Sequence, residues 1–158
     1  MNKSCKLCWA IVTLSLAAVV VMAWMFVIRG NVTASNDGRT AIVLSGSERD
    51  LVLAEMRVFL ESVQAITAGI AEKDVKAVEE SARASGMAEF QGVPVSLMSK
   101  LPLEFKALGR STHEAFDDIA REARDMGDEK ALLSSLGEMM LKCTSCHAAY
   151  RLEVETAK

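Results

Sequence analysis

The chain has few of the residues that interrupt helices or build strands. Its 158 residues include only two prolines, Pro94 and Pro102, and the part that follows the N-terminal segment has few runs of β-branched residues. This scarcity favours a helical fold. The chain also lacks a grouping of acid, base and nucleophile of the kind that catalysis requires, so we do not expect an enzyme.

Acidic residues are absent from the first 29 positions, where the only charged side chains are Lys3, Lys6 and Arg29. Residues 9–28 are uncharged and mostly apolar. A helix needs roughly 20 such residues to cross a hydrocarbon core, whereas the apolar region of a secretory signal is shorter, roughly 7–15 residues. We therefore predict a cytoplasmic N-terminus over residues 1–8 and a transmembrane signal anchor over residues 9–28.

The two basic residues that precede the apolar segment predict its orientation. Lys3 and Lys6 favour a cytoplasmic N-terminal end, because short cytoplasmic segments are enriched in basic residues. The prediction is a single-pass protein of the inner membrane, with its C-terminal domain in the periplasm if the cell is a Gram-negative bacterium. Val32-Thr33-Ala34 resembles a small-residue cleavage site, and cleavage there would give a periplasmic protein instead.

Basic residues are also in the minority in the rest of the chain. From Gly30 onward there are 15 basic and 21 acidic residues, since three of the 18 basic residues precede it. The resulting net charge of about −6 makes nucleic acid an unsuitable partner. An extracytoplasmic redox protein with a basic patch is a better one, because opposite charges steer association.

Beyond the anchor, the composition predicts a linker, one domain and a short tail. Residues 29–46 are rich in Gly, Ser, Thr, Asn and Asp, which is typical of a flexible linker. Residues 47–152 have the length of one small domain. Residues 153–158 are expected to form a C-terminal tail.

Apolar residues recur at steps of three and four through most of the predicted domain and indicate four amphipathic helices. Ser47 and Asp50 resemble a capping box at the start of the first helix. Asp74 and Asp128 are expected to cap the second and fourth helices, and Pro102 suits the first turn of the third. Four such helices with short connections predict an all-α, antiparallel four-helix bundle behind one N-terminal transmembrane helix.

The most specific motif is Cys143-Thr144-Ser145-Cys146-His147, in the last predicted helix. C-x-x-C-H is the attachment signature of covalent haem c. Two cysteines three residues apart share a helical face, where their sulfurs can add to the two vinyl groups of one porphyrin. The following histidine can bind the iron as a proximal ligand.

Two other uses of a C-x-x-C pair compete with haem attachment. A redox dithiol usually lies near a βαβ pattern, and no strand alternation surrounds this motif. A zinc site needs a second Cys/His pair, and His113 stands alone in the domain, where a surface or core position is expected for it. Cys5 and Cys8 also form a C-x-x-C, but Trp9 follows in place of histidine, so this pair is interpreted as incidental.

With this motif near its C-terminus, the chain resembles the cytochrome c′ group, the class II c-type cytochromes. The resemblance lies in the four-helix pattern and in Cys143 to Arg151, where the family motif continues with two residues, an aromatic and an arginine. It implies one covalent haem held by Cys143 and Cys146, with His147 as the proximal iron ligand. It also implies a position for Arg151 near the proximal haem face, one turn beyond His147.

The same resemblance implies that the first helix of the domain supplies the other face of the iron. Met56 lies on its inner stripe and is the candidate for a distal ligand or a distal-pocket residue, with core packing as the alternative. Leu53 and Leu60 are neighbours that could instead shield a vacant iron face. Dimers are common in the family, so a homodimer is an expectation here.

Three functions remain open from the sequence. The favoured one is electron transfer by a membrane-anchored, extracytoplasmic c-type cytochrome. The alternative is a five-coordinate haem protein that binds or detoxifies a small gas such as nitric oxide. The third is a helical interaction module in which Cys143 and Cys146 never receive haem.

Overall fold

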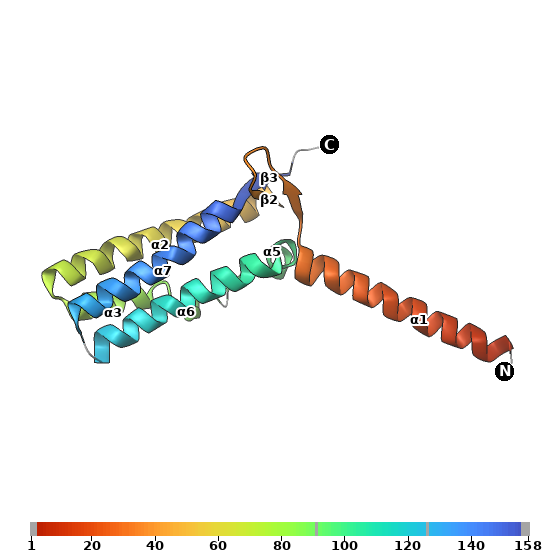
Figure 1. Ribbon diagram of the computed structural model, residues 1–158, viewed down its shortest axis with the longest axis horizontal. Helices are drawn as coiled ribbons and strands as arrows, with labels where there is room; N and C mark the ends of the chain where they lie inside the picture. Colours follow the sequence, from red (N-terminus) through yellow and green to blue (C-terminus); the bar gives the residue numbers. More distant parts are fainter. Residues whose placement is uncertain (1–2, 91, 126, 156–158) are drawn as a thin grey trace.

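The computed structural model describes residues 3–90, 92–125 and 127–155. One long N-terminal helix extends away from a compact helical domain (Figure 1). This helix, α1 (Lys3–Ala23), continues into a π-helical segment, η1 (Trp24–Arg29). Residues Lys6–Arg29 are long and apolar enough to cross a membrane or to act as a signal, and none of this segment is buried against the domain. Residues 1–2 of the predicted N-terminal segment lie outside the described residues.

Four helices of the domain correspond to the four expected from the sequence. They are α2 (Gly46–Glu72), α3 (Val75–Arg83), α6 (Leu103–Asp125) and α7 (Glu129–Ala149), and two short helices, α4 (Met87–Phe90) and α5 (Val95–Lys100), lie between α3 and α6. The predicted N-caps Asp74 and Asp128 are confirmed, since each carboxylate accepts a hydrogen bond from a backbone N–H three residues on, at 3.0 and 2.7 Å. The capping box at Ser47 and Asp50 is wrong, because Ser45 and Glu48 form it.

The apolar interior consists of two clusters. The first, which we call the helical core, takes buried residues from four helices: Ile66 of α2, Val78 and Ala82 of α3, Phe116, Ile119, Ala120 and Ala123 of α6, and Leu132, Leu136 and Met139 of α7. The second, the sheet-side core, comprises Ile42, Leu44, Val52, Leu97, Leu101 and Phe105. Because α3 has nine residues, it covers only part of the length of its three longer neighbours.

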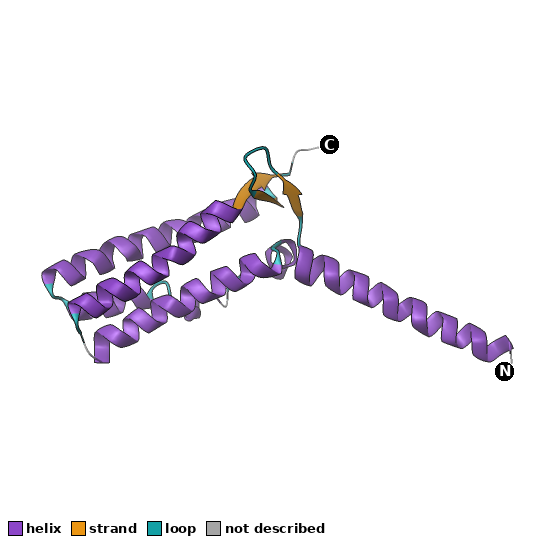
Figure 2. Ribbon diagram, in the orientation of Figure 1, coloured by secondary structure: helices purple, strands orange, loops and turns teal. Residues whose placement is uncertain are grey.

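The second core exists because the domain also contains a small sheet, so the all-α expectation needs correction. Strand β1 (Val32–Ala34) pairs antiparallel with β2 (Thr40–Leu44), and β2 pairs parallel with β3 (Tyr150–Val154). Figure 2 shows this sheet at the end of the domain that meets the anchor helix. Its central strand carries Ile42 and Leu44, both completely buried.

The sheet also changes the predicted domain boundaries. Residues 29–46 are not a flexible linker, because two of the three strands lie within them. The predicted tail, residues 153–158, begins inside β3, and residues 156–158 lie outside the described residues. The physical reason is burial: the alternate side chains of Thr40–Leu44 that point inward form half of an apolar layer whose other half is helical.

Candidate haem site

The Cys143–His147 motif occupies the last two turns of α7, which ends at Ala149. Both cysteines are half-buried and neither forms a disulfide. Cys143 packs against the helical core, whereas Cys146 packs against the sheet-side core. The two sulfurs therefore lie at the level of the domain where one apolar cluster gives way to the other.

The environment of the thiols keeps them protonated. Burial raises the pKa of Cys143, and it raises the pKa of Cys146 to about 11, with a smaller contribution from Cys143. Reactive dithiols have lowered pKa values, because the thiolate is the nucleophile and the metal ligand. Neither thiol therefore has the lowered pKa that is typical of a reactive dithiol.

His147 follows the cysteines on the exposed side of α7. Its backbone carbonyl accepts a hydrogen bond from Arg39 Nη1 at 3.3 Å. Among the described residues, its imidazole nitrogens have no hydrogen-bond partner. The ring is thus available to a ligand.

The neighbouring helix α2 presents an apolar stripe at the same level. Leu53, Met56, Leu60 and Val63 follow one another at steps of three and four residues, and α2 lies beside α7 (Figure 1). Met56 packs against the sheet-side core, as Cys146 does, and Val63 packs against the helical core, as Cys143 does. Leu60 lies between these two positions on the stripe, yet 69% of it is exposed.

Helix α6 carries a glycine, Gly109, on the stripe that faces the other helices. This glycine lies four residues after Phe105 of the sheet-side core and three before buried Thr112, so it belongs to the inner stripe of α6. A Cβ atom added at Gly109 would nevertheless meet no other atom within 4 Å. Gly109 is itself only half-buried, so a side chain at this position would extend into open space rather than against a packed neighbour.

The donor set also fits haem. Among the residues that the structure describes, no group of three His, Cys, Asp or Glu side chains is arranged to hold a metal ion. A haem iron takes four ligands from its porphyrin, so one imidazole from the chain is enough. Cys143, Cys146 and His147 thus have the spacing and exposure that such a group requires.

Arg151 is not on the same helix as His147. The helix ends before it, and Arg151 lies in β3, where its guanidinium contacts Asp37 at 3.1 Å and Glu153 at 3.3 Å. The expectation that Arg151 follows His147 by one helical turn is therefore wrong. The strand forms instead because Thr40 and Ala41 of β2 pair with Tyr150 and Arg151.

Arg39 and Asp37, which the sequence analysis did not single out, connect the β1–β2 turn to the end of α7. Arg39 contacts Asp37 at 2.6 Å and donates to the carbonyl oxygen of Tyr150 at 3.4 Å. Hydrogen bonds from Arg39 and Ser35 hold the pKa of Asp37 far below its usual range. The only sequence signal for this cluster is the Ser35–Asp37–Gly38 turn composition, which predicts a turn but not its distant partner.

His113 is a core histidine, one of the two positions expected for it. Its ring is 2% exposed and lies edge-on to Phe59 and Phe90, with centroid distances of 4.9 and 5.3 Å. Nδ1 lies 2.8 Å from the carbonyl oxygen of Ser85, and Nε2 lies 3.1 Å from Oε1 of Glu55. No pattern in the sequence indicates Glu55 as its partner, because the two residues lie 58 positions apart.

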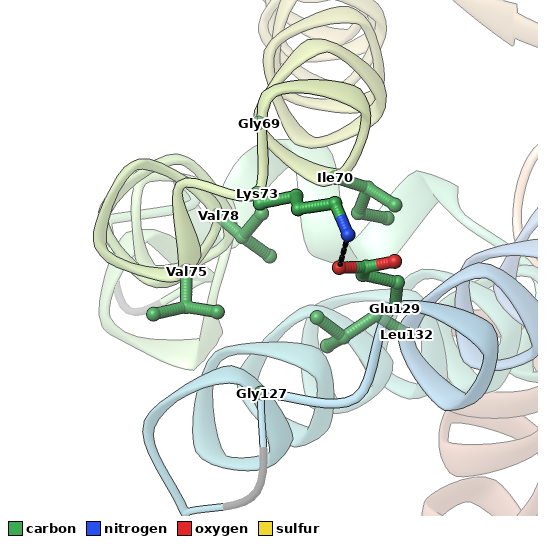
Figure 3. A pocket seen from close by; sticks show the side chains of 8 residues that line it. All are labelled: Gly69, Ile70, Lys73, Val75, Val78, Gly127, Glu129 and Leu132. Carbon is green, nitrogen blue, oxygen red and sulfur yellow. Dashed lines mark ion pairs between the residues drawn. The ribbon is translucent and has the colours of Figure 1, made fainter.

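The end of the domain away from the sheet holds a small cavity, between the α2–α3 turn and the start of α7. Its volume is about 30 Å³, and the ion pair of Lys73 and Glu129, at 3.0 Å, crosses its opening (Figure 3). That volume suits about one water molecule. A haem does not fit into a cavity of this size.

Comparison with protein-family models, with curated proteins and with solved structures finds no match for this chain.

Proposed function

We propose that the chain is a membrane-anchored, extracytoplasmic c-type cytochrome that binds one covalent haem and transfers electrons. The single observation that carries this proposal is the setting of the Cys143–His147 motif. Its two half-buried thiols lie where the helical core and the sheet-side core separate. The inner stripes of α6 and α2 also carry an unfilled position at Gly109 and an exposed apolar side chain at Leu60. A covalently held porphyrin would bury apolar surface there that otherwise faces water.

In this proposal Cys143 and Cys146 form the two thioether bonds, and His147 binds the iron on the proximal side. Met56 of α2 is the distal candidate, supported by its position on the same apolar cluster as Cys146. The haem supplies one-electron chemistry when it is bound, and the apolar side chains of α2, α6 and α7 restrict its contact with water. The shared core of α2, α3, α6 and α7 supports a cytochrome c′-like four-helix bundle as the architecture of the site.

The proposal includes an uncleaved anchor with the domain on the periplasmic side. Two features support retention of the helix: Ala34 belongs to β1, and Asn31 exchanges hydrogen bonds with Val43. Cleavage after Ala34 would remove both. The orientation follows from Lys3 and Lys6, as argued from the sequence.

A second candidate is the binding of a small gas by five-coordinate haem. Leu60 is the observation that favours it, because this exposed apolar side chain lies one turn beyond Met56 on the same stripe of α2. An aliphatic side chain over the iron would leave the distal position vacant, whereas the Met56 thioether would fill it and raise the potential.

The decisive experiment is expression of the full chain in a host that matures c-type cytochromes. We expect a covalently attached haem that survives denaturation and appears with the protein after electrophoresis. Cys143→Ala should abolish the normal double attachment, and the matched control Cys8→Ala, which alters an exposed cysteine of α1, should leave it intact. A normal yield of doubly attached haem in Cys143→Ala would contradict the proposal.

The absorption spectrum of the same preparation separates the two functions. Six-coordinate ferrous iron whose spectrum becomes five-coordinate in Met56→Leu is expected for electron transfer with Met56 as ligand. A five-coordinate ferrous spectrum in the unmodified protein that shifts with carbon monoxide would exclude Met56 and favour gas binding.

A further inference from the structure

A second cavity, which we call the junction cavity, lies where the anchor helix meets the domain. Its volume is about 310 Å³, at the lower end of the range of small-molecule sites, roughly 300–1,000 Å³. Its apolar wall consists of Ile28, Val32, Pro102 and Leu103. Since Ile28 is the last apolar residue of the helix that is long enough to span a membrane, the cavity would lie at the membrane surface.

Several contacts hold the walls of the junction cavity together. The Asn31 N–H donates to the carbonyl oxygen of Lys100 at 2.7 Å, and Lys106 Nζ donates to the carbonyl oxygen of Val27 at 3.0 Å. Gly30, at φ +66°, lies so close to the backbone before α6 that an added Cβ would be 2.5 Å from the Lys100 carbonyl oxygen. The anchor helix, the sheet and the start of α6 are thus fixed relative to one another.

The polar part of the junction cavity favours a neutral ligand that donates hydrogen bonds. Glu104 is the only charged side chain among the described residues that line it, and the others on this side are Thr40 and Tyr150. The Tyr150 hydroxyl donates to Glu104 Oε2 at 3.1 Å, which leaves Oε1 to accept from a ligand. A lipid phosphate would meet a carboxylate with no lining cation, so anionic head groups are disfavoured.

The junction cavity also borders the apolar cluster against which one of the proposed haem cysteines, Cys146, packs. Tyr150 follows the end of α7 and meets the ring of Phe105 edge-on at 5.4 Å. Phe105 belongs to the sheet-side core, against which both Tyr150 and Cys146 pack. Tyr150, which lines the cavity, and Cys146 thus pack against the same apolar cluster.

We infer that the junction cavity binds the ring of a membrane-soluble quinol, with a ring hydroxyl donating to Glu104. This inference rests on the proposed electron-transfer function, for which it names the electron donor. Oxidation of one quinol to quinone releases two electrons and two protons. With haem bound, two molecules of the ferric protein would each take up one electron, and both protons would leave to water past the exposed Glu104 carboxylate.

Binding is tested with the full chain in phosphatidylcholine nanodiscs and tetramethylhydroquinone as the probe, by calorimetry without oxygen. The haem is kept fully reduced, so that no electron transfer occurs. We expect saturable binding that empty nanodiscs do not show. Glu104→Gln should weaken it about fivefold, because a hydrogen bond to a carboxylate is stronger than one to an amide. Leu103→Trp should abolish it by filling the cavity.

Matched controls are Glu138→Gln and Leu133→Trp, which alter exposed residues of α7 away from the junction. Both should bind the probe as the unmodified chain does. Uptake equal to that of empty nanodiscs, or equal affinity in Glu104→Gln and Glu138→Gln, would overturn the inference. If the chain carries covalent haem but does not bind the probe saturably, only the proposed quinol site is contradicted. If the chain binds the probe saturably but carries no covalent haem, the proposed electron-transfer function is contradicted.

Discussion

At the scale of single residues, the two oxygen atoms beside the buried His113 ring determine how many protons the site holds. Both of its ring nitrogens face oxygen acceptors, the Ser85 carbonyl at Nδ1 and the Glu55 carboxylate at Nε2. A neutral imidazole has only one N–H, so the pair of hydrogen bonds requires a second proton on the ring or on Glu55. The buried site therefore holds a proton that the unfolded chain binds less tightly.

This arrangement predicts a pH-dependent contribution to stability. Burial alone lowers the pKa of His113, but Glu55 and the backbone carbonyl of Ser85 outweigh it, and the net result is a pKa above the ordinary value of 6.5. A raised pKa means that the folded state binds more protons than the unfolded state. The stabilisation is then complete below about pH 6.5 and is lost as the pH rises through the raised pKa.

We expect His113→Gln to lower the free energy of unfolding by about 2 kcal/mol at pH 5.5, the typical value of a hydrogen bond to a charged group. The difference from the unmodified chain should shrink by pH 8.5. Chemical denaturation at several pH values measures it. Glu55→Gln should flatten the same profile, and a difference that stays constant with pH would contradict the assignment.

Residue patterns close in sequence could be predicted, and distant pairings could not. The spacing of Cys143, Cys146 and His147 is local, and their placement on one helix follows from it. The His113–Glu55 contact joins residues 58 positions apart, and no periodicity indicates which carboxylate reaches a buried ring. Arg151 was misplaced for a similar reason, because its strand depends on a partner near the other end of the chain.

At the scale of elements, the helices were predictable and the strands were not. The apolar stripes of α2, α6 and α7 extend over many turns, which makes a period of 3.6 residues recognisable. Strand β2 has five residues, and its flanking Gly, Ser and Asn residues resemble a linker. The correct cap was visible nonetheless, since Ser45 and Glu48 fit the S-x-x-E pattern better than Ser47 and Asp50 do.

Helix α6 provides a test of the proposed haem position through Gly109. Replacement of this glycine by alanine should stabilise the haem-free chain by about 0.5–1 kcal/mol, because alanine favours the helix and the added Cβ meets no atom within 4 Å. Gly109→Leu should instead reduce the yield of covalent haem or perturb its absorption spectrum, since the larger side chain would occupy the porphyrin's space.

Gly137 is the matched control for this prediction. It lies within α7, is exposed, and also has open space at its Cβ position. Gly137→Leu should therefore leave the haem yield and spectrum unchanged. Equal effects of the two leucine variants would indicate a general response of the helices and would remove the support that Gly109 gives to the haem site.

At the scale of the whole molecule, the sheet fixes the orientation of the N-terminal helix relative to the domain. A flexible linker would let the domain sample many orientations above a membrane. The strands β1 and β2, the Asn31 hydrogen bonds and the close approach at Gly30 fix one orientation instead. If the N-terminal helix spans a membrane, as proposed, the sheet and the start of α6 would face the membrane surface, and the four-helix end with Lys73 and Glu129 would lie farthest from it.

This fixed junction predicts resistance to proteolysis between the anchor and the domain. Arg39 would be an immediate trypsin site in a flexible linker, but it is adjacent to β2 and forms an ion pair with Asp37.

Gly30→Ala combines a strained positive φ with a Cβ contact of 2.5 Å. Strain of this kind costs roughly 1–3 kcal/mol, so cleavage at Arg39 should become about tenfold faster. Gly46→Ala, where the added Cβ meets nothing within 4 Å, should not change the rate. Rapid cleavage at Arg39 in the unmodified chain would mean that residues 29–46 are a flexible linker after all, and the fixed orientation and the junction cavity would both be lost with that result.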